Sequence, residues 1–325
     1  MMEIPAINPD SEHYSTLLHP AGCMSRLEDV ANWFAKRQGK AIPDQLKPAI
    51  VLFAADHGVA SSFAYPESRP TTAERVAYAT SDASVIRKLA DEAGASLRII
   101  DLGVRGDLSG VEVEKVRESG SADIRTEPAM SQEEYWEAVG IGEELAAHAV
   151  AEGANLLIAS SLTSGDHVSV AAVICELAGL VPEETLASGS DGTYGDELLA
   201  LATVLERAQG TPSNDILREV GGLELAAMAG FYRAAARKGV PVLLDGMASA
   251  AAALGSAAWD IRIAGWLLAS FASDKSGHAS ALEELGLEPM VHLHRGLGGG
   301  KGAALLIPVL QAAISLQRGL ATIED

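Results

Sequence analysis

The chain alternates short, uninterrupted apolar runs with longer segments of helical periodicity. A continuous apolar run without polar alternation is typical of a parallel strand that is buried on both faces. Four such runs predict strands over residues 49–55, 97–101, 155–159 and 240–245, and a shorter run at 290–293 predicts a further buried strand.

The segments between these runs repeat apolar residues at intervals of three and four, which predicts helices. Ser131, followed three residues later by Glu134, has the chemistry of a capping box at the start of one helix. We expect an irregular, exposed segment over 106–130, and helices over 25–38, 71–92, 131–152, 171–180, 197–207, 217–237 (interrupted at Gly221-Gly222), 248–258, 262–271 and 279–285.

Strands that alternate with helices favour an α/β fold with a mostly parallel, Rossmann-like sheet flanked by helices. The N-terminal helix and the last helix stand outside this alternation, and we expect them to pack together. The sequence therefore predicts a small helical lobe from residues 1–45 and 303–325, and a large α/β nucleotide-binding domain from residues 46–302.

A glycine-rich turn precedes the last helix, with five glycines between positions 296 and 302. Glycine permits positive φ and close approach of the backbone, and a helix N-terminus offers free N–H groups to an anion. The turn is not a P-loop, because Gly302 follows Lys301 where that motif requires Ser or Thr. A loose dinucleotide fingerprint that begins at Gly298 carries little weight this near the C-terminus. We expect phosphate or nucleotide contact at this turn.

Polar residues follow the first and third predicted strands, at the end where open α/β sheets bind ligands. Asp56 and His57 follow the first strand, and the turn after the third contains Ser161, Thr163, Gly165 and Asp166. Two alternatives stay open. His57 either serves the site or makes a hydrogen bond in the core, and the hydroxyls of the turn hold a phosphate or sugar or cap a helix.

The net charge of −20 argues against nucleic acid and anionic membranes as partners. The two cysteines, Cys23 and Cys175, have no metal-binding spacing, which fits a reducing cytoplasm and predicts no metal site. The N-terminal residues do not resemble a signal peptide, and no segment has the length and apolarity of a membrane span. We expect a cytoplasmic protein with small-molecule ligands.

Several motifs resemble those of the nicotinate-nucleotide:dimethylbenzimidazole phosphoribosyltransferase family, over about residues 17 to 320. They are Phe-Ala-Ala-Asp-His-Gly-Val at 53–59, Asp-Leu-Gly-Val at 101–104, Leu-Arg-Glu-Val-Gly-Gly-Leu-Glu-Leu-Ala at 217–226 and Pro-Val-Leu-Leu-Asp-Gly at 241–246. The resemblance implies transfer of ribose 5-phosphate from nicotinate mononucleotide to a ring nitrogen of a benzimidazole, with inversion. It also implies a homodimer that needs no metal or cofactor.

The chain departs from the family where the chemistry is expected. Gly299 stands where the family has its general base, a Glu, and Ser161 replaces a second acid. Phe63 replaces a Ser, and Glu74 replaces a Gln that lines the benzimidazole slot. The family's phosphate-binding Lys has no counterpart, because residues 194–206 contain neither Lys nor Arg.

The loss of a general base costs about two to four orders of magnitude in rate. Candidate replacements are Glu74 or Asp56 as the base and Lys301 as the phosphate-binding cation. The resemblance also implies a set of residues that bind the aromatic base or the phosphate. They are Asp56, His57, Phe63, Tyr65, Glu74, Ser161, Thr163, Gly165, Asp166, Gly192, Leu297, Gly298, Gly300 and Lys301.

Three functions are compatible with these observations. The first is an active phosphoribosyltransferase with a changed aromatic acceptor. The second is a catalytically impaired paralogue that serves as a binding or regulatory subunit, in a homodimer or with a paralogous partner chain. The third is an unrelated nucleotide-binding enzyme such as a dehydrogenase.

Overall fold

The structure is a computed structural model that describes residues 3–8, 26–186, 192–274, 276–293 and 297–319. Cys23, and Gly296 at the start of the glycine-rich turn, lie outside the described residues. So do residues 1–2 and 9–25 of the proposed small lobe.

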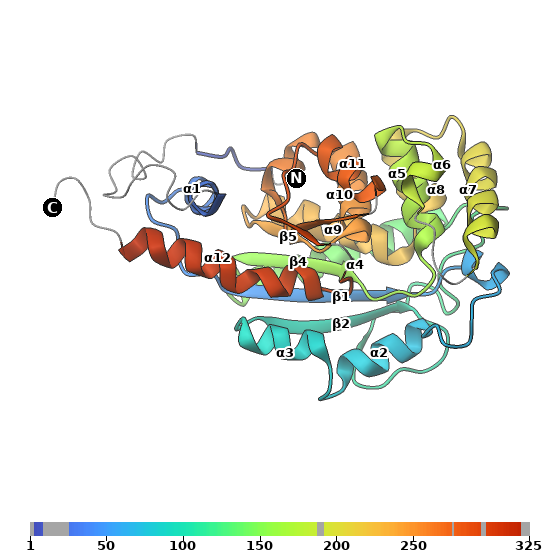
Figure 1. The fold of residues 1–325 in the computed structure, drawn as a ribbon, viewed down its shortest axis with the longest axis horizontal. Coiled ribbons are helices and arrows are strands. Elements are labelled where there is room, and N and C mark those ends of the chain that lie inside the picture. Colours follow the sequence, from blue (N-terminus) through green and yellow to red (C-terminus); the bar gives the residue numbers. More distant parts are fainter. Residues whose placement is uncertain (1–2, 9–25, 187–191, 275, 294–296, 320–325) are drawn as a thin grey trace.

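A six-stranded sheet of order β3-β2-β1-β4-β5-β6 forms the centre of the molecule (Figure 1). Every neighbouring pair in it is parallel. The chain runs outward from β1 to β3 and then returns to the other side of β1, so the strand order reverses between β1 and β4. This confirms the predicted α/β fold with a parallel, Rossmann-like sheet. The strands are β1 (Pro48–Ala55), β2 (Ser96–Gly103), β3 (Glu112–Val113), β4 (Leu156–Ser161), β5 (Val242–Leu244) and β6 (Leu267–Ala269).

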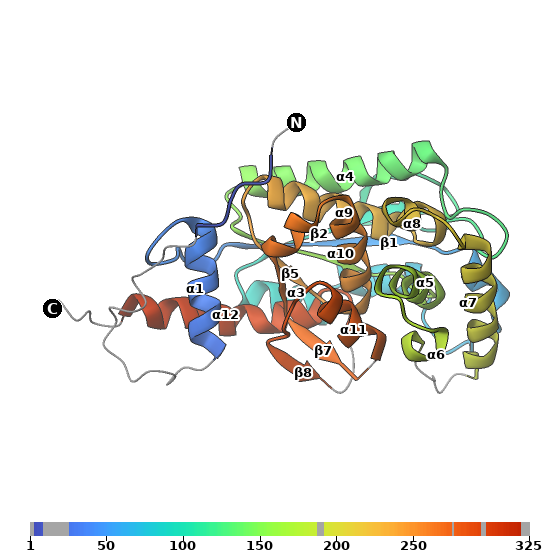
Figure 2. The same ribbon diagram turned by 90° about the horizontal axis from the view of Figure 1, so that it is seen from above.

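Helices cover both faces of the sheet, as Figure 2 shows. All eight residues of β1 are buried, and alternate side chains point to opposite faces. Phe53 packs in one hydrophobic cluster with α4 and α9, whereas Leu52 packs in a second cluster with α1, α3 and α12. These helices are α1 (Arg26–Gln38), α3 (Val85–Glu92), α4 (Gln132–Ala151), α9 (Leu223–Arg237) and α12 (Lys301–Gly319).

Further short elements connect these layers. A separate two-stranded parallel sheet joins β7 (Phe271–Ser273) to β8 (Val291–Leu293). The remaining elements are η2 (Val59–Ser62), α2 (Thr72–Thr80), α5 (His167–Ala178), α6 (Pro182–Thr185), α7 (Tyr194–Ala208), η3 (Ser213–Asp215), α8 (Ile216–Val220), α10 (Met247–Trp259), η4 (Ile261–Trp266) and α11 (Ser276–Glu284).

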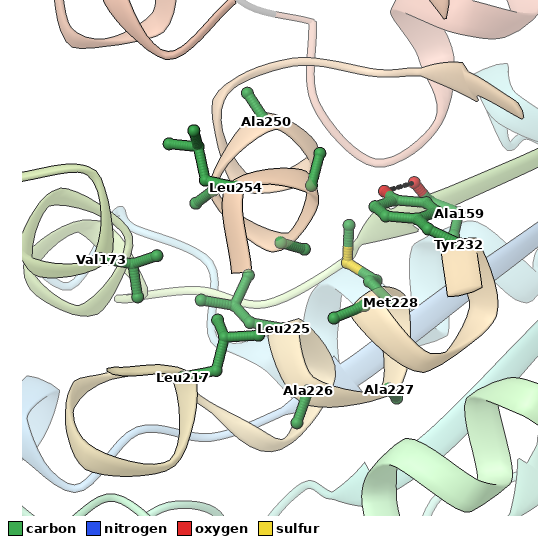
Figure 3. Packing of buried hydrophobic residues seen from close by; sticks show 14 of the residues in the cluster. Ala159, Val173, Leu217, Leu225, Ala226, Ala227, Met228, Tyr232, Ala250 and Leu254 are labelled. Atoms are coloured by element: carbon green, nitrogen blue, oxygen red, sulfur yellow. Dashed lines mark hydrogen bonds between the residues drawn. The ribbon is translucent and has the colours of Figure 1, made fainter. Parts of the chain in front are cut away.

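Helix α9 lies in the core, where alanines and leucines pack it against α10 (Figure 3). Its Tyr232 hydroxyl donates a hydrogen bond of 3.1 Å to the carbonyl of Ala159 at the end of β4. On its other side α9 touches α4 backbone to backbone. A Cβ on Gly142 would lie 1.8 Å from the Ala227 carbonyl oxygen, so only glycine fits at that crossing.

Two predicted elements are wrong for local reasons, and a third is present but less buried than expected. The helix over 71–92 is two helices, because Ser84 caps α3 by accepting a bond from the Arg87 N–H. The helix over 262–271 is instead η4 followed by β6 and β7, since a short apolar run fits a strand as well as a helix. The strand at 290–293 exists as β8, but it is only partly buried at the edge of the small sheet.

The segment 106–130 is less exposed than expected. It contains β3, and Ser121 forms an isolated bridge with His57. Ile124 and Met130 are buried in the core. The capping box at Ser131 and Glu134 is confirmed at the start of α4.

Helices α1 and α12 pack together, as both ribbon views show (Figures 1 and 2). Phe34 of α1 and Ile307 of α12 share a cluster with Ile50 of the sheet, so both helices also contact the large domain. The division into two lobes stays a prediction. Among the described helices, none is long and apolar enough to cross a bilayer.

Candidate functional site

A cavity of about 380 Å³ opens at the carboxyl ends of β4 and β5. It lies beside the point where the strand order reverses, which is where open α/β sheets bind their ligands. The starts of α5 and α10 and the glycine-rich turn before α12 form its walls. Residues that line it include Arg75, Ser160, Ser161, Thr163, Asp166, His167, Glu197, Asp245, Met247, Phe271, Gly298 and Gly299.

Asp245, at the end of β5, fixes the glycine-rich turn. Its carboxylate accepts hydrogen bonds from the N–H groups of Gly300 (2.6 Å) and Ala303 (2.8 Å) and from the Ser160 hydroxyl (2.7 Å). Burial raises the pKa of Asp245, although these donors and the charge of Lys301 oppose the shift. The predicted anion site therefore needs a correction: two of the N–H groups at the start of α12 are already bound to an internal carboxylate.

The glycines of this turn are required by its backbone. Gly298, Gly299 and Gly300 all have positive φ, at 38°, 64° and 79°. A Cβ on Gly300 would lie 2.9 Å from a methyl group of Leu52, so the turn packs directly on the sheet.

Two cations adjoin the cavity without an ion-pair partner among the described residues. Arg75 of α2 donates one hydrogen bond of 2.9 Å to the Thr163 carbonyl, which leaves the rest of its guanidinium available. The side chain of Lys301 folds back toward Gly299, which lines the cavity. A Cβ on Gly299 would lie 3.2 Å from the Lys301 Nζ. Burial lowers the pKa of both groups. The charge of Asp166 opposes this shift for Arg75, and the charge of Asp245 opposes it for Lys301, whose pKa the charge of Arg75 lowers further.

The turn after β4 places hydroxyls and an acid on the cavity wall. The Ser161 hydroxyl donates to Asp166 at 3.3 Å and accepts from the Thr163 N–H at 3.2 Å. Gly165 has a φ of 87°, and a Cβ there would lie 2.7 Å from the Ala60 side chain. The structure thus brings Ser161, Thr163 and Asp166 to the cavity, whereas Gly165 shapes the turn behind them.

Glu197 of α7 is a second acid on the wall and is only 5% exposed. Its Oε1 accepts a hydrogen bond of 2.8 Å from the Tyr65 hydroxyl and lies 3.6 Å from Nδ1 of His167. Burial raises the pKa of Glu197, but the bonds from His167 and Tyr65 outweigh it and lower the pKa overall. Arg69 stacks over the Tyr65 ring at 3.7 Å.

His57 does not line the cavity. It is buried, with Nδ1 2.9 Å from the Ser169 hydroxyl and Nε2 2.8 Å from Glu224. Burial lowers the pKa of His57, but the charge and hydrogen bond of Glu224 outweigh it, so the pKa is raised. Gly222 makes room for this pair, since a Cβ there would lie 2.4 Å from the imidazole. Of the two alternatives, the structure favours the core contact.

The two acids predicted as replacement bases also lie elsewhere. Glu74 is exposed, and its carboxylate accepts the Thr71 N–H at 2.8 Å in a capping box that starts α2. The Asp56 carboxylate accepts the Arg105 N–H at 2.9 Å. Neither residue lines the cavity, so the geometry does not support the prediction that one of them is the base.

Three further predicted residues do not line the cavity. Phe63 packs edge-on against Tyr65 at 5.6 Å between ring centres and also contacts the core. Gly192 is an exposed residue with a φ of 78° shortly before α7, and Leu297 is 38% exposed. Whether they bind a ligand stays a prediction.

Sequence reasoning missed Arg75, His167, Glu197 and Asp245 as site residues. Asp245 could have been predicted from the sequence, because it lies at the end of a predicted strand and directly before a glycine. Asp56, which follows the first strand, lies two residues before a glycine. Arg75 and Glu197 could not have been predicted, since each is one charged residue among many on a helix. In the described part of the chain, no group of three or more His, Cys, Asp or Glu is arranged to hold a metal.

Comparisons with known proteins agree with this geometry. Residues 6–325 match a family model described as "Phosphoribosyltransferase". A nicotinate-nucleotide–dimethylbenzimidazole phosphoribosyltransferase of Chromobacterium violaceum is 40% identical over 100% of this chain and 96% of its own length. The one from Mycobacterium marinum is 37% identical over 95% of this chain and 88% of its own.

A solved structure gives the same result in three dimensions. The enzyme of this name from Thermus thermophilus superimposes with a TM-score of 0.89 at 34% identity, and the match covers 98% of both chains. Family model, sequence relatives and fold agree over nearly the whole length of the chain. The chain therefore belongs to the nicotinate-nucleotide–dimethylbenzimidazole phosphoribosyltransferase family.

Proposed function

We propose that this protein transfers the phosphoribosyl group of nicotinate mononucleotide to a ring nitrogen of a benzimidazole-type base, a step of cobamide lower-ligand synthesis. One observation carries the proposal. Arg75 and Lys301 are partly buried cations that adjoin the cavity, and neither forms an ion pair among the described residues. A bound phosphate can accept charge-assisted hydrogen bonds from both cations.

The rest of the cavity suits the other half of the reaction. Val170, Leu186, Met247 and Phe271 give it an apolar side that fits a flat aromatic base. The base attacks the anomeric carbon, and the bond to the pyridinium nitrogen breaks with its electron pair going to nicotinate. Nicotinate then leaves as a neutral pyridine, so the leaving group needs no acid.

The comparisons favour this transferase over the dehydrogenase and over the impaired paralogue, because the relatives bear the transferase name at 40% and 37% identity over nearly the whole chain. The absence of a carboxylate at Gly299 then means that the proton of the acceptor must go to another group.

The test uses purified protein with nicotinate mononucleotide and dimethylbenzimidazole, with nicotinate and ribazole phosphate followed by chromatography. We expect both products to form together, in equal amounts and at a rate proportional to protein. Nicotinate without ribazole phosphate would indicate hydrolysis instead. No nicotinate with any of a panel of benzimidazoles would overturn the proposal.

We further propose that the protein is a cytoplasmic homodimer. An exposed apolar stripe on α12 supports an interface: Leu305, Val309 and Leu316 are 45%, 38% and 47% exposed. Cys175, which is buried as a free thiol next to the Thr185 hydroxyl, fits a reducing compartment. Light scattering on the purified protein, with Leu305→Glu as the interface variant, tests the dimer.

A further inference from the structure

The proposed reaction leaves one proton to be placed. When one ring nitrogen of the acceptor attacks the anomeric carbon, the other loses its proton, so the product is neutral. A group on the cavity wall must take that proton. Asp245 is unsuited, because its carboxylate already accepts three hydrogen bonds that fix the glycine-rich turn. Asp166 accepts the Ser161 hydroxyl.

His167 has the position that this step requires. It is the first residue of α5, lines the cavity, and its side chain is 37% exposed. Behind it Glu197 is nearly buried, with Oε1 3.6 Å from Nδ1 of the imidazole. Glu197 is held in turn by the Tyr65 hydroxyl at 2.8 Å. An imidazole backed by an oriented carboxylate is the usual arrangement of a general base.

Arg69 also contacts this imidazole. Its Nη2 lies 3.2 Å from Nδ1 and 3.5 Å from Nε2 of His167. A guanidinium only donates, so Arg69 can orient the ring but cannot take the proton of the acceptor.

We propose that His167 is the general base of the phosphoribosyl transfer and that Glu197 is its positioning residue; the inference rests on the proposed function. The acceptor nitrogen forms the C–N bond while the bond to nicotinate breaks. The proton of the acceptor passes to a ring nitrogen of His167. The resulting imidazolium is stabilised by Glu197 and returns the proton to water after the products leave.

The charged and titratable groups around His167 come from three elements. Glu197 lies on α7, Asp166 precedes His167 at the start of α5, and Tyr65, Arg69 and Arg75 come from α2 and the segment before it. Glu197 and Arg69 contact the imidazole itself, whereas Asp166 and Arg75 line the same cavity. A substitution at any of them changes the charge around the ring, so the test substitutes His167 itself.

The experiment compares wild type with His167→Ala, Glu197→Gln and a matched control. We expect His167→Ala to lower kcat by about 10²- to 10⁴-fold with little change in the KM for nicotinate mononucleotide, and Glu197→Gln to lower it less. Added imidazole should restore part of the rate to His167→Ala but not to Glu197→Gln. The control is His148→Ala, which removes a solvent-exposed histidine 3.2 Å from Glu152 on α4 and should change nothing.

The outcomes separate the two proposals. A wild type that releases no nicotinate overturns the proposed function. If the wild type is active and His167→Ala is equally active, this inference alone is overturned. It is also overturned if His167→Ala keeps the native melting temperature but imidazole does not restore its rate. A nitro-substituted benzimidazole, whose N–H is more acidic, should lose less rate in His167→Ala than dimethylbenzimidazole does. An equal loss with both acceptors contradicts a role in proton transfer.

Discussion

The carboxylate of Asp245 lies 2.6 Å from the amide nitrogen of Gly300, so the end of a central strand holds the start of the last helix. The contact joins residues 55 positions apart. It turns the positive end of the helix toward a side chain of the protein rather than toward a ligand. This contact holds the glycine-rich turn in place, so that Gly298 and Gly299 line the cavity.

Replacement of this carboxylate tests the contact. Asn at position 245 keeps one acceptor oxygen, so Asp245→Asn leaves at least one buried N–H group unbonded. We expect a loss of about 1–3 kcal/mol in the free energy of unfolding, measured with urea. Asp91→Asn, at an exposed position on α3, should leave stability unchanged. An Asp245→Asn protein as stable as wild type would contradict the contact.

Arg75 and Lys301 predict a specific kinetic effect. Arg75→Ala and Lys301→Ala should each raise the KM for nicotinate mononucleotide about 10- to 100-fold, because a hydrogen bond to a charged group contributes about 1.5–3 kcal/mol. Initial rates over a range of nucleotide concentrations measure this. Lys238→Ala, an exposed lysine beyond the end of α9, is the control for lost charge. An unchanged KM in both site variants would show that the phosphate binds elsewhere.

A carboxylate at position 299 is the third test. Gly299 has a φ of 64°, and a Cβ there would lie 3.2 Å from both Leu162 and Lys301. We expect Gly299→Glu to cost about 1–2 kcal/mol of stability through strain in the left-handed region. The new acid should raise transferase turnover, most clearly when it is added to His167→Ala. Gly299→Gln has the same size and strain but no base, and an equal gain with Gln would rule out proton transfer.

The buried pair of His57 and Glu224 predicts a pH dependence of stability. Because the pKa of His57 is raised above its usual value of 6.5, the pair contributes fully below about pH 6.5, and its contribution falls as pH rises through the folded-state pKa. Melting temperatures from pH 5 to 9 measure this. We expect His57→Gln to abolish that decline and to cost about 3–5 kcal/mol, since Glu224 then stays buried without its partner. A decline that persists in His57→Gln would assign it to other groups.

The sheet was predictable because its chemistry is local. The apolar runs at 49–55 and 155–159 favour buried strands, and β1 and β4 follow them closely. The run at 262–273 does not by itself distinguish a strand from a helix. Strand β6 forms there because it pairs with Leu243 and its neighbours in β5, and this pairing cannot be read from the sequence.

The site was harder to predict because distant contacts assign its roles. The sequence identifies Asp56-His57-Gly58 as a polar strand end, but Glu224, 167 positions away, draws His57 into the core. Glu74 follows Thr71 at the capping-box spacing, which identifies it as a cap rather than a base. Glu197 enters the site only because Tyr65 and His167 fold against it.

The packing of α1 on α12 has a consequence for how the chain folds during synthesis. The apolar face of α1, with Val30 and Phe34, is covered in part by Leu310 and Ile314 of the last helix. The ribosome makes the first helix long before its partner, and domains with such distant contacts fold slowly. The N-terminal helix therefore completes its packing only after the last helix has left the ribosome.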